Sequence, residues 1–422
     1  MSRRPSGRDL LVRNASALML SSVGTGALGL VYWIIAEHHF PTSEVGRASA
    51  IISSATVLSS LACLSLGGAY QRFLPVSGDR TVRLLLGGHL LITATATLLG
   101  TGFVLLGFGD RLLFSTGERW GFVAMVIVFA QYAICDPILT GLRQAPAVAA
   151  KNIGLSAIKI VPLVVITATP TAFVITGSWA VAAAVITAIA IFHGFRVALR
   201  RRDESHALLP GGRELLSFQS AFFAMMLVSS VTPLVLPLLV VHQAGTTQNA
   251  YFNLAWTMCS AVGLLRAAVG SAFVVEAALP DADRPALLRR FGRMLAAVTA
   301  LGAGGLAIGG PLVLWFTGPD YLHAAAPLMM VMAVDSIVQT CVTTYYLVAQ
   351  LQRRLRLMVA AQIVVMVLTV GGSAVLLGPL GLVGVAVGSL SASVVALLIV
   401  ARPLVRGIRE MATVERPVEP VG

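Results

Sequence analysis

Long runs of apolar side chains constrain the fold of this chain more than any other feature of its sequence. Each run is about 20 residues long, which as an α-helix matches the roughly 30 Å hydrocarbon core of a bilayer. Of the 422 residues, 57% are hydrophobic and only 11% are charged, whereas a soluble domain carries about 25% charged residues. The composition therefore predicts an all-α integral membrane protein. The twelve runs expected to span the membrane are 13–36, 46–68, 84–107, 120–142, 149–168, 174–195, 217–241, 250–272, 292–315, 323–348, 357–377 and 380–401.

The distribution of the 30 basic residues predicts the orientation of these helices. Of these, 25 lie at the two termini, in loops after even-numbered runs or at the edges of those loops, and Lys151 is assigned to one of these cytoplasmic loops. Two others, Lys159 and Arg266, lie deeper inside runs. The remaining three, Arg47, Arg111 and Arg119, fall on the opposite side. Because positively charged loops stay in the cytoplasm, both termini are predicted to be cytoplasmic. A missed or additional helix would scramble this alternation, so the count of twelve is supported independently.

A basic strap near the middle of the chain marks the predicted boundary between two lobes. It joins the sixth and seventh runs, holds five arginines and ends near a Pro-Gly-Gly break. No other loop is longer, and none is long enough to fold as an aqueous domain. The predicted parts are an N-terminal six-helix lobe (1–195), a cytoplasmic basic linker (196–216), a C-terminal six-helix lobe (217–401) and a cytoplasmic tail (402–422).

A weak internal repeat supports this division. The triplet Ser-Ser-Val at 21–23 recurs at 229–231, and residues 44–47 align with residues 248–251, each group opening the next helix. Six helices, an even number, separate the equivalent positions, so the two lobes run in the same sense across the membrane. They are therefore expected to be related by a pseudo-twofold axis along the membrane normal.

Other functions of a basic chain are disfavoured by its motifs. The arginines are scattered in short clusters without a base-stacking module, so no nucleic-acid partner is expected. The four cysteines lie in apolar segments without a CxxC pair, as small packing residues do. A GxxxxGK[ST] phosphate loop and a GxSxG nucleophile motif are absent, so neither ATP hydrolysis nor an enzymatic activity is expected. No cofactor and no metal are expected.

Ionisable side chains inside the apolar runs are the main candidates for function, because each costs several kcal/mol unless it faces a partner or water. Lys159 lies near the membrane midplane, on one helical face with Asn152 and Ser156, and Pro162 is expected to kink the helix just after it. Two interpretations stay open. Lys159 is either an internally paired or snorkelling lysine, or a cavity cation that binds phosphate or takes part in coupling.

Asp136 precedes Pro137 and shares a helical face with Tyr132, Thr140 and Arg143. Because the fourth and fifth runs are antiparallel neighbours, Asp136 is a candidate partner for Lys159, as a structural ion pair or as a proton-linked pair. The sequence does not distinguish between these two kinds of pair.

Two further charges lie in the C-terminal lobe. Arg266 points about 140° away from the polar stripe through Asn253, so it is a candidate either for the cavity or for contact with a neighbouring helix. Asp335, with Gln339 on its face, is either an ion or proton site or a buried, hydrogen-bonded aspartate.

A polar group is expected at the outer mouth, and a hinge is expected in the seventh helix. The outer group is explained by interfacial solvation, by gating or by sugar contact, and consists of Glu37, His38, His39, Glu44 and Arg47. Pro233 and Pro237 remove two backbone donors one turn apart and should bend or break the seventh helix.

The first two helices carry a resemblance to a known family. Residues 34–40 (IIAEHHF), 41–48 (PTSEVGRA) and 67–75 (GGAYQRFLP) resemble the first loops of bacterial polysaccharide flippases, in which a short outer loop leads into a Glu-aromatic-Gly start of helix 2. Val45 stands at the aromatic position. These flippases belong to the multidrug/oligosaccharidyl-lipid/polysaccharide (MOP) transporter superfamily. The resemblance implies two six-helix lobes forming a V, alternating access to a central cavity, and a lipid-linked oligosaccharide on undecaprenyl pyrophosphate as substrate.

We therefore expect a flippase that moves a lipid-linked oligosaccharide to the outer face of the bacterial inner membrane. Cationic residues of both lobes would contact the pyrophosphate, and membrane lipids and polysaccharide-assembly enzymes would be partners. The first alternative is a drug or cation antiporter of the same superfamily. The second is a membrane-embedded glycan polymerase or ligase, which the short outer loops disfavour.

Overall fold

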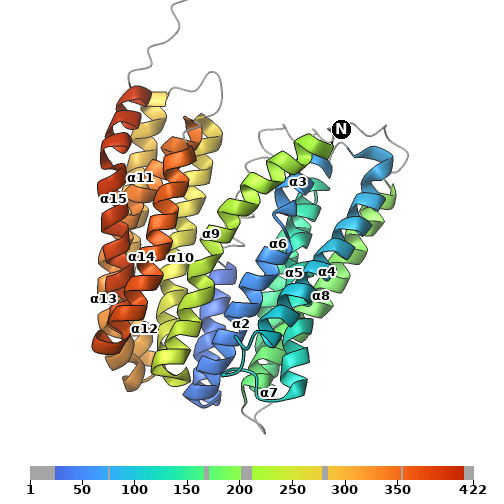
Figure 1. The fold of residues 1–422 in the computed structure, drawn as a ribbon, viewed down its shortest axis with the longest axis horizontal. Coiled ribbons are helices and arrows are strands. Elements are labelled where there is room, and N and C mark those ends of the chain that lie inside the picture. The colour runs from blue at the N-terminus through green and yellow to red at the C-terminus, as the bar shows by residue number, and fades with distance from the viewer. Residues whose placement is uncertain are drawn as a thin grey trace, which may run out of the picture. The chain divides into compact units, whose positions relative to one another are not determined.

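The computed structural model describes residues 24–74, 77–165, 171–200, 212–277, 284–352 and 355–412. Within these ranges all regular structure is helical, so the predicted all-α fold is confirmed. Ten helices of the described part are long and apolar enough to cross a membrane (Figure 1). The other two predicted spans correspond to the helix over residues 24–39, whose predicted start at residue 13 lies outside the described residues, and to α10. The chain is a multi-pass membrane protein.

The first part of the chain follows the predicted runs with two additional breaks. After the helix over residues 24–39 come α2 (Thr42–Ala62), α3 (Leu66–Phe73), the short η2 (Gly78–Arg80), α4 (Thr81–Leu105), α5 (Thr116–Gly141), α6 (Ala145–Ile158), α7 (Ile160–Val165), α8 (Ala172–Arg200) and α9 (Gly212–Ala244). The predicted run 46–68 is interrupted because Leu64 and Ser65 adopt left-handed backbone conformations. The run 149–168 is interrupted at Lys159, because Pro162 cannot donate to the carbonyl of Ile158 and its ring crowds that oxygen.

The second part contains longer helices. They are α10 (Thr246–Ala277), α11 (Arg284–Gly304), the π-helical segment η3 (Gly305–Gly309), α12 (Gly310–Thr317), α13 (Pro319–Leu351), α14 (Leu355–Leu380) and α15 (Leu382–Ala412). The predicted run 292–315 is thus divided among α11, η3 and α12. The π-helical turn η3 is wider than the α-helical turns on either side.

The chain divides into two compact units, residues 1–250 and 251–422. In the first unit α5 is central and packs against α2, α3, α4, α6 and α8, while α9 packs against α2. In the second unit α15 packs along both α13 and α14. Residues 201–211 of the predicted linker lie outside the described residues, so the division into lobes at 196–216 stays a prediction.

Glycines let α14 and α15 approach closely. A Cβ built on Gly384 would lie 2.2 Å from the carbonyl oxygen of Leu376, and one on Gly388 would lie 2.8 Å from the amide nitrogen of Ser373. Only hydrogen in place of a side chain fits at these positions, which is how small residues serve helix packing in membranes. The outward faces carry large apolar side chains, such as Leu98 and Leu398, which are 72% and 73% exposed.

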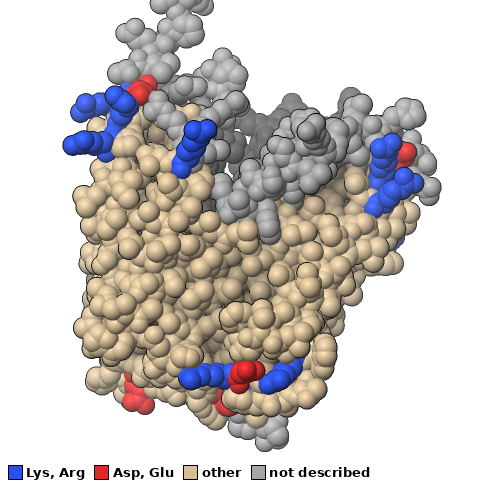
Figure 2. Space-filling model, viewed as in Figure 1, with Lys and Arg blue, Asp and Glu red and all other residues tan. Residues whose placement is uncertain are grey.

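The charged residues that are visible on one face lie at the ends of the helices. Figure 2 shows the described Lys, Arg, Asp and Glu residues at the two edges of this face, with a band of uncharged residues between them. Such a band is the surface that a hydrocarbon core covers.

Pro233 and Pro237 lie inside α9, which stays helical from Gly212 to Ala244. The ribbon of α9 changes direction along its length but is not interrupted (Figure 1). A proline costs one backbone hydrogen bond and displaces the preceding turn, which a long helix absorbs by bending. The hinge role of the two prolines stays a prediction.

Candidate functional site

Lys159 occupies an aromatic box at the break between α6 and α7. Its Nζ lies 3.5 Å from the ring centroid of Trp179 and 4.7 Å from that of Tyr32. The side chain is nearly closed off from solvent, with the residue 3% exposed. The charge is stabilised by the electron-rich faces of the two rings, which attract an ammonium without neutralising it.

The box is held rigidly by neighbouring contacts. The Tyr32 hydroxyl donates to the carbonyl of Ile175 at 2.9 Å and lies 3.0 Å from the Ser178 hydroxyl. The rings of Tyr32 and Trp179 meet edge to face, with centroids 5.3 Å apart. Among the described residues, no carboxylate forms an ion pair with Lys159.

Asp136 pairs with Lys151, not with Lys159. The Lys151 Nζ lies 3.1 Å from Asp136 Oδ1, donates to the carbonyl of Tyr132 at 3.0 Å and lies over the Tyr132 ring. The assignment of Lys151 to a cytoplasmic loop is wrong, because α6 begins at Ala145 and places Lys151 in its second turn, where the residue is 5% exposed. Lys159 lies two turns further along α6, out of reach of the Asp136 carboxylate.

The polar stripe predicted on the fifth run is divided between these two environments. Asn152 joins the Asp136 cluster, since its Nδ2 donates to Asp136 Oδ2 at 3.3 Å and its Oδ1 accepts from the Tyr132 hydroxyl at 2.6 Å. Ser156 donates to the carbonyl of Asn152 in its own helix at 2.9 Å. Neither side chain is hydrogen-bonded to Lys159.

Arg266, Gln339 and Asp335 form a buried chain in the second unit. The two terminal nitrogens of Arg266 donate to the carbonyl of Ser336 at 2.9 Å and to Gln339 Oε1 at 3.1 Å. Gln339 Nε2 donates to Asp335 Oδ2 at 2.8 Å, and the Ser389 hydroxyl donates to the same oxygen at 2.7 Å. Arg266 therefore contacts α13, and its charge reaches the fully buried Asp335 through one intervening amide.

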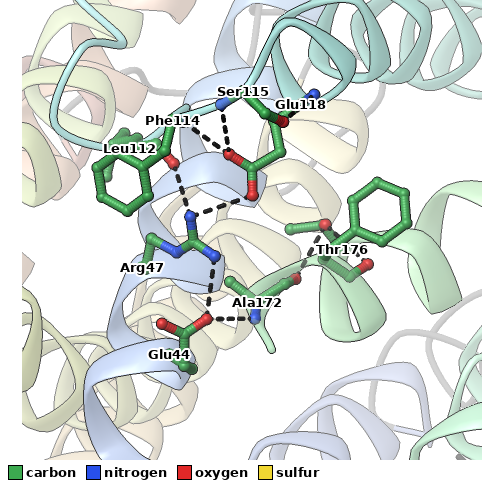
Figure 3. Close-up of polar contacts among 9 residues, drawn as sticks. Glu44, Arg47, Leu112, Phe114, Ser115, Glu118, Ala172 and Thr176 are labelled. Atoms are coloured by element: carbon green, nitrogen blue, oxygen red, sulfur yellow. Dashed lines mark hydrogen bonds and ion pairs between the residues drawn. The ribbon is translucent and has the colours of Figure 1, made fainter. Parts of the chain in front are cut away.

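The outer group is centred on Arg47. Its guanidinium points between two carboxylates (Figure 3), with Glu44 Oε2 at 3.0 Å and Glu118 Oε1 at 3.2 Å. Glu44 also accepts from the amide of Ala172 at the start of α8, and Glu118 accepts from the amides of Phe114 and Ser115 before α5. The cluster thus ties α2 to the starts of α5 and α8.

The three other predicted outer residues lie outside the Arg47 cluster. His39 is exposed, and its Nδ1 donates to the carbonyl of Ile35 at 2.9 Å. His38 is exposed, and its Nδ1 donates to the carbonyl of Ile34 one turn earlier at 2.8 Å. Glu37 is half-buried, and its Oε2 has no hydrogen-bond partner among the described residues.

Several residues of these clusters were missed from the sequence, and some had a readable signal. Ser115 and Glu118 form a capping box, whose Ser-x-x-Glu spacing is visible before the apolar run. The apolar residues 145–150 before Lys151 indicate an earlier helix start. Tyr32, Trp179 and Ser389 had no signal, because each meets its charged partner on another helix. Tyr32 and Trp179 lie 127 and 20 residues from Lys159 along the chain, and Ser389 lies 54 residues from Asp335.

Comparisons with known proteins find similarity at the level of the fold. No family model matches the chain, and a search of curated proteins finds no match. Among solved structures, the lipid II flippase MurJ in an inward closed conformation has a TM-score of 0.69 at 13% identity, covering 95% of this chain and 90% of that one. An inward-facing multidrug resistance MATE family transporter of the MOP superfamily has a TM-score of 0.63 at 14% identity, covering 93% and 96%.

A third solved structure is an MOP superfamily transporter from Pyrococcus furiosus, described by the reverse polarity of its binding pocket. Its TM-score is 0.56 at 14% identity, and the match covers 97% of this chain and 99% of that one. All three matches extend over nearly the whole chain. The chain therefore has the fold of MOP superfamily transporters, as the loop resemblance implied.

Proposed function

We propose that the protein is a transporter of the MOP superfamily that moves a lipid-linked oligosaccharide from the cytoplasmic to the outer face of the bacterial inner membrane. One observation carries the proposal: the amine of Lys159 is buried and forms no ion pair with a carboxylate among the described residues. The likeness to a lipid II flippase supports the same class of substrate.

Two other pairs of opposite charges inside the described helices lie close together. Asp136 and Lys151 form an ion pair, and Arg266 and Asp335 are linked through Gln339. This leaves Lys159 with an uncompensated positive charge in an environment of low dielectric. Such a site attracts a phosphate or pyrophosphate and repels a cationic drug.

The mechanism that fits this site is alternating access. Lys159 is closed off in the present conformation, so a pyrophosphate reaches it only in a state in which the surrounding helices have separated. The aromatic box then keeps the ammonium in place without consuming its charge, and the bound diphosphate crosses the membrane beside it. Both termini remain in the cytoplasm during the cycle.

Deleting the gene should trap lipid-linked sugar on the inner leaflet and abolish surface glycan. In the complemented strain, Lys159→Met should abolish translocation, Lys159→Arg should retain part of it, and Arg119→Met should leave it unchanged. Arg119 is the matched control, because it pairs with Asp110 at an exposed site. Protein abundance in the membrane is measured in each strain. Normal surface glycan in the deletion strain, or full activity of Lys159→Met, would overturn the proposal.

A drug or cation antiporter is the second candidate. It is favoured by the MATE structures and by Asp335, whose Oδ1 is buried without a hydrogen-bond partner among the described residues. A carboxylate of this kind suits a coupling cation. Drug-resistance and cation-driven efflux assays with wild type and Asp335→Asn distinguish the two functions, because a flippase produces neither resistance nor efflux.

A further inference from the structure

The last helix is longer than the bilayer is thick. The 31 residues of α15 span about 46 Å at 1.5 Å per residue, whereas the hydrocarbon core is about 30 Å thick. Its first 20 residues, 382–401, include no charged residue, and the charged residues begin at Arg402. The end of α15 therefore leaves the hydrocarbon near Arg402 and continues through the headgroup region.

One face of this end is firmly docked on the second unit. Met411 is buried with Phe273, Phe291 and Val348, and Leu404 and Ile408 pack against the same cluster. A Cβ on Gly407 would lie 2.6 Å from a methyl group of Val348, so the helix lies almost in contact with α13. The opposite face is consequently held in a defined position.

That opposite face carries a row of arginines beside a hollow. Arg402, Arg406 and Arg409 follow one another at intervals of four and three residues, and all three are exposed. The hollow has a volume of about 630 Å³ and is lined by these arginines together with Ala401, Val405 and Glu410. Arg402 and Arg406 form no ion pair or hydrogen bond with the part of the chain that the structure describes.

The same helical face is apolar one turn earlier. Leu398 is 73% exposed and lies four residues before Arg402, and Val394 is exposed a further turn back. Along this line the helix presents apolar side chains, then guanidinium groups. A phospholipid has its parts in the same order, with acyl chains first and a phosphate next. The planar guanidinium fork matches two phosphate oxygens.

We propose that this face of α15 is a binding site for an anionic phospholipid. Arg402 and Arg406 hold the phosphate in the hollow, and an acyl chain lies along Leu398. The site shares no residue with the surroundings of Lys159, on which the proposed function rests. A soluble phosphate compound is disfavoured as the occupant because the arginine row continues directly into the lipid-facing apolar row.

The test is lipid binding by the purified full-length protein, measured by native mass spectrometry during titration with phosphatidylglycerol and phosphatidylcholine. Arg402→Gln/Arg406→Gln should weaken phosphatidylglycerol binding by about tenfold or more at low salt. The matched control is Arg196→Gln/Arg200→Gln, which removes the same charge at the same spacing from the exposed end of α8. This control should change binding less than about twofold. Thermal stability should not differ between the variants.

A third variant, Leu398→Gln, distinguishes a lipid from a soluble phosphate. It should weaken phosphatidylglycerol binding and leave binding of glycerol 3-phosphate unchanged. Equal losses in both arginine pairs would show attraction by net charge alone and overturn the site. Equal affinity for phosphatidylcholine would overturn its preference for anionic lipid.

Discussion

The Lys151 ammonium is surrounded by three kinds of acceptor. Its Nζ meets the Asp136 carboxylate at 3.1 Å, the Tyr132 carbonyl at 3.0 Å and the face of the Tyr132 ring. The side chain of Lys151 is 2% exposed, whereas that of Asp136 is 36% exposed. Loss of the Asp136 carboxylate and loss of the Lys151 ammonium should therefore affect stability differently, because only the lysine side chain is withdrawn from water.

At the residue scale we predict that Asp136→Ala is more destabilising than Lys151→Met. Removing the carboxylate leaves a buried ammonium without its counter-ion, at a cost of about 1–3 kcal/mol. The double variant Asp136→Ala/Lys151→Met should recover part of that loss, because the buried charge is then removed as well. Thermal unfolding of the four proteins in detergent gives the coupling energy. Additive effects of the two substitutions would contradict the pair.

Lys159 is also buried, but its surroundings differ from those of Lys151. Its charge is stabilised by aromatic faces and by no described carboxylate. A cation–π contact is worth roughly 0.5–2 kcal/mol, less than an ion pair in a dry environment can supply. The proposed transport of an anionic substrate depends on the part of this charge that the rings leave uncompensated.

At the element scale, Arg47 joins three segments that are distant in sequence. It belongs to α2, it binds Glu118 at the start of α5, and it shares Glu44 with the first amide of α8. A carboxylate at a helix N-terminus is favourable because the free amides there carry partial positive charge. The cluster thus fixes the ends of α5 and α8 relative to α2.

We predict that Arg47→Lys lowers the free energy of unfolding by about 2–3 kcal/mol. One ammonium cannot meet both carboxylates and the Leu112 carbonyl, which the guanidinium reaches together. Arg119→Lys is the control, with an expected change below about 0.5 kcal/mol, because the side chains of its pair with Asp110 are 45% and 63% exposed. Chemical or thermal unfolding in detergent measures both. Similar effects of the two variants would show that the Arg47 cluster has no special role.

Two segments that the weak sequence repeat aligns with each other are in contact in the structure. Residues 44–47 align with residues 248–251, and these two segments touch: Asn249 Nδ2 donates to the carbonyl of Gly46 at 2.8 Å and to Ser49 Oγ at 2.9 Å. A Cβ on Gly46 would lie 1.7 Å from the carbonyl oxygen of Thr246. The internal repeat and the pseudo-twofold relation of the two lobes stay predictions.

At the scale of the whole molecule, the alternation of basic loops predicts the orientation in the membrane. In a variant whose four cysteines are replaced, a single cysteine at His39 or Ser115 should react with an impermeant thiol reagent in intact cells. A cysteine at Arg200 or Arg406 should react only after permeabilisation. These positions lie at helix ends and are exposed or lie in an exposed turn, so access is set by the side of the membrane. Labelling of Arg406→Cys in intact cells would contradict the cytoplasmic placement of the C-terminus.

Much of the fold could be predicted because local sequence properties determine it. Apolar length specifies where a helix can cross a bilayer, and the described helices follow the predicted runs. The breaks were harder to predict. Pro162 was expected to kink its helix, whereas the left-handed residues Leu64 and Ser65 gave no comparable sign.

The chemistry of the buried charges shows where sequence alone is insufficient. The flanking apolar runs predicted that Lys159, Asp136, Arg266 and Asp335 lie within helices. In the structure Asp136, Arg266 and Asp335 lie in α5, α10 and α13, Lys159 lies at the α6–α7 break, and all of them except Asp136 are buried. Their partners depend on packing between helices. Lys151 reaches Asp136 because of the start of α6, and Lys159 meets Trp179 and Tyr32 because α8 and the first helix pass beside the α6–α7 break.

The sequence by itself determined that the chain is an all-α, multi-pass membrane protein, because the cost of placing charge and unpaired backbone in hydrocarbon leaves no other fold for such composition. Only the tertiary structure decided which buried charges are paired. Coulomb attraction and cation–π contact act over a few ångströms, and a shift of one helical turn exchanges one partner for another. That exchange, from Lys159 to Lys151 beside Asp136, leaves Lys159 without an ion-pair partner among the described residues, which is the feature on which the proposed function rests.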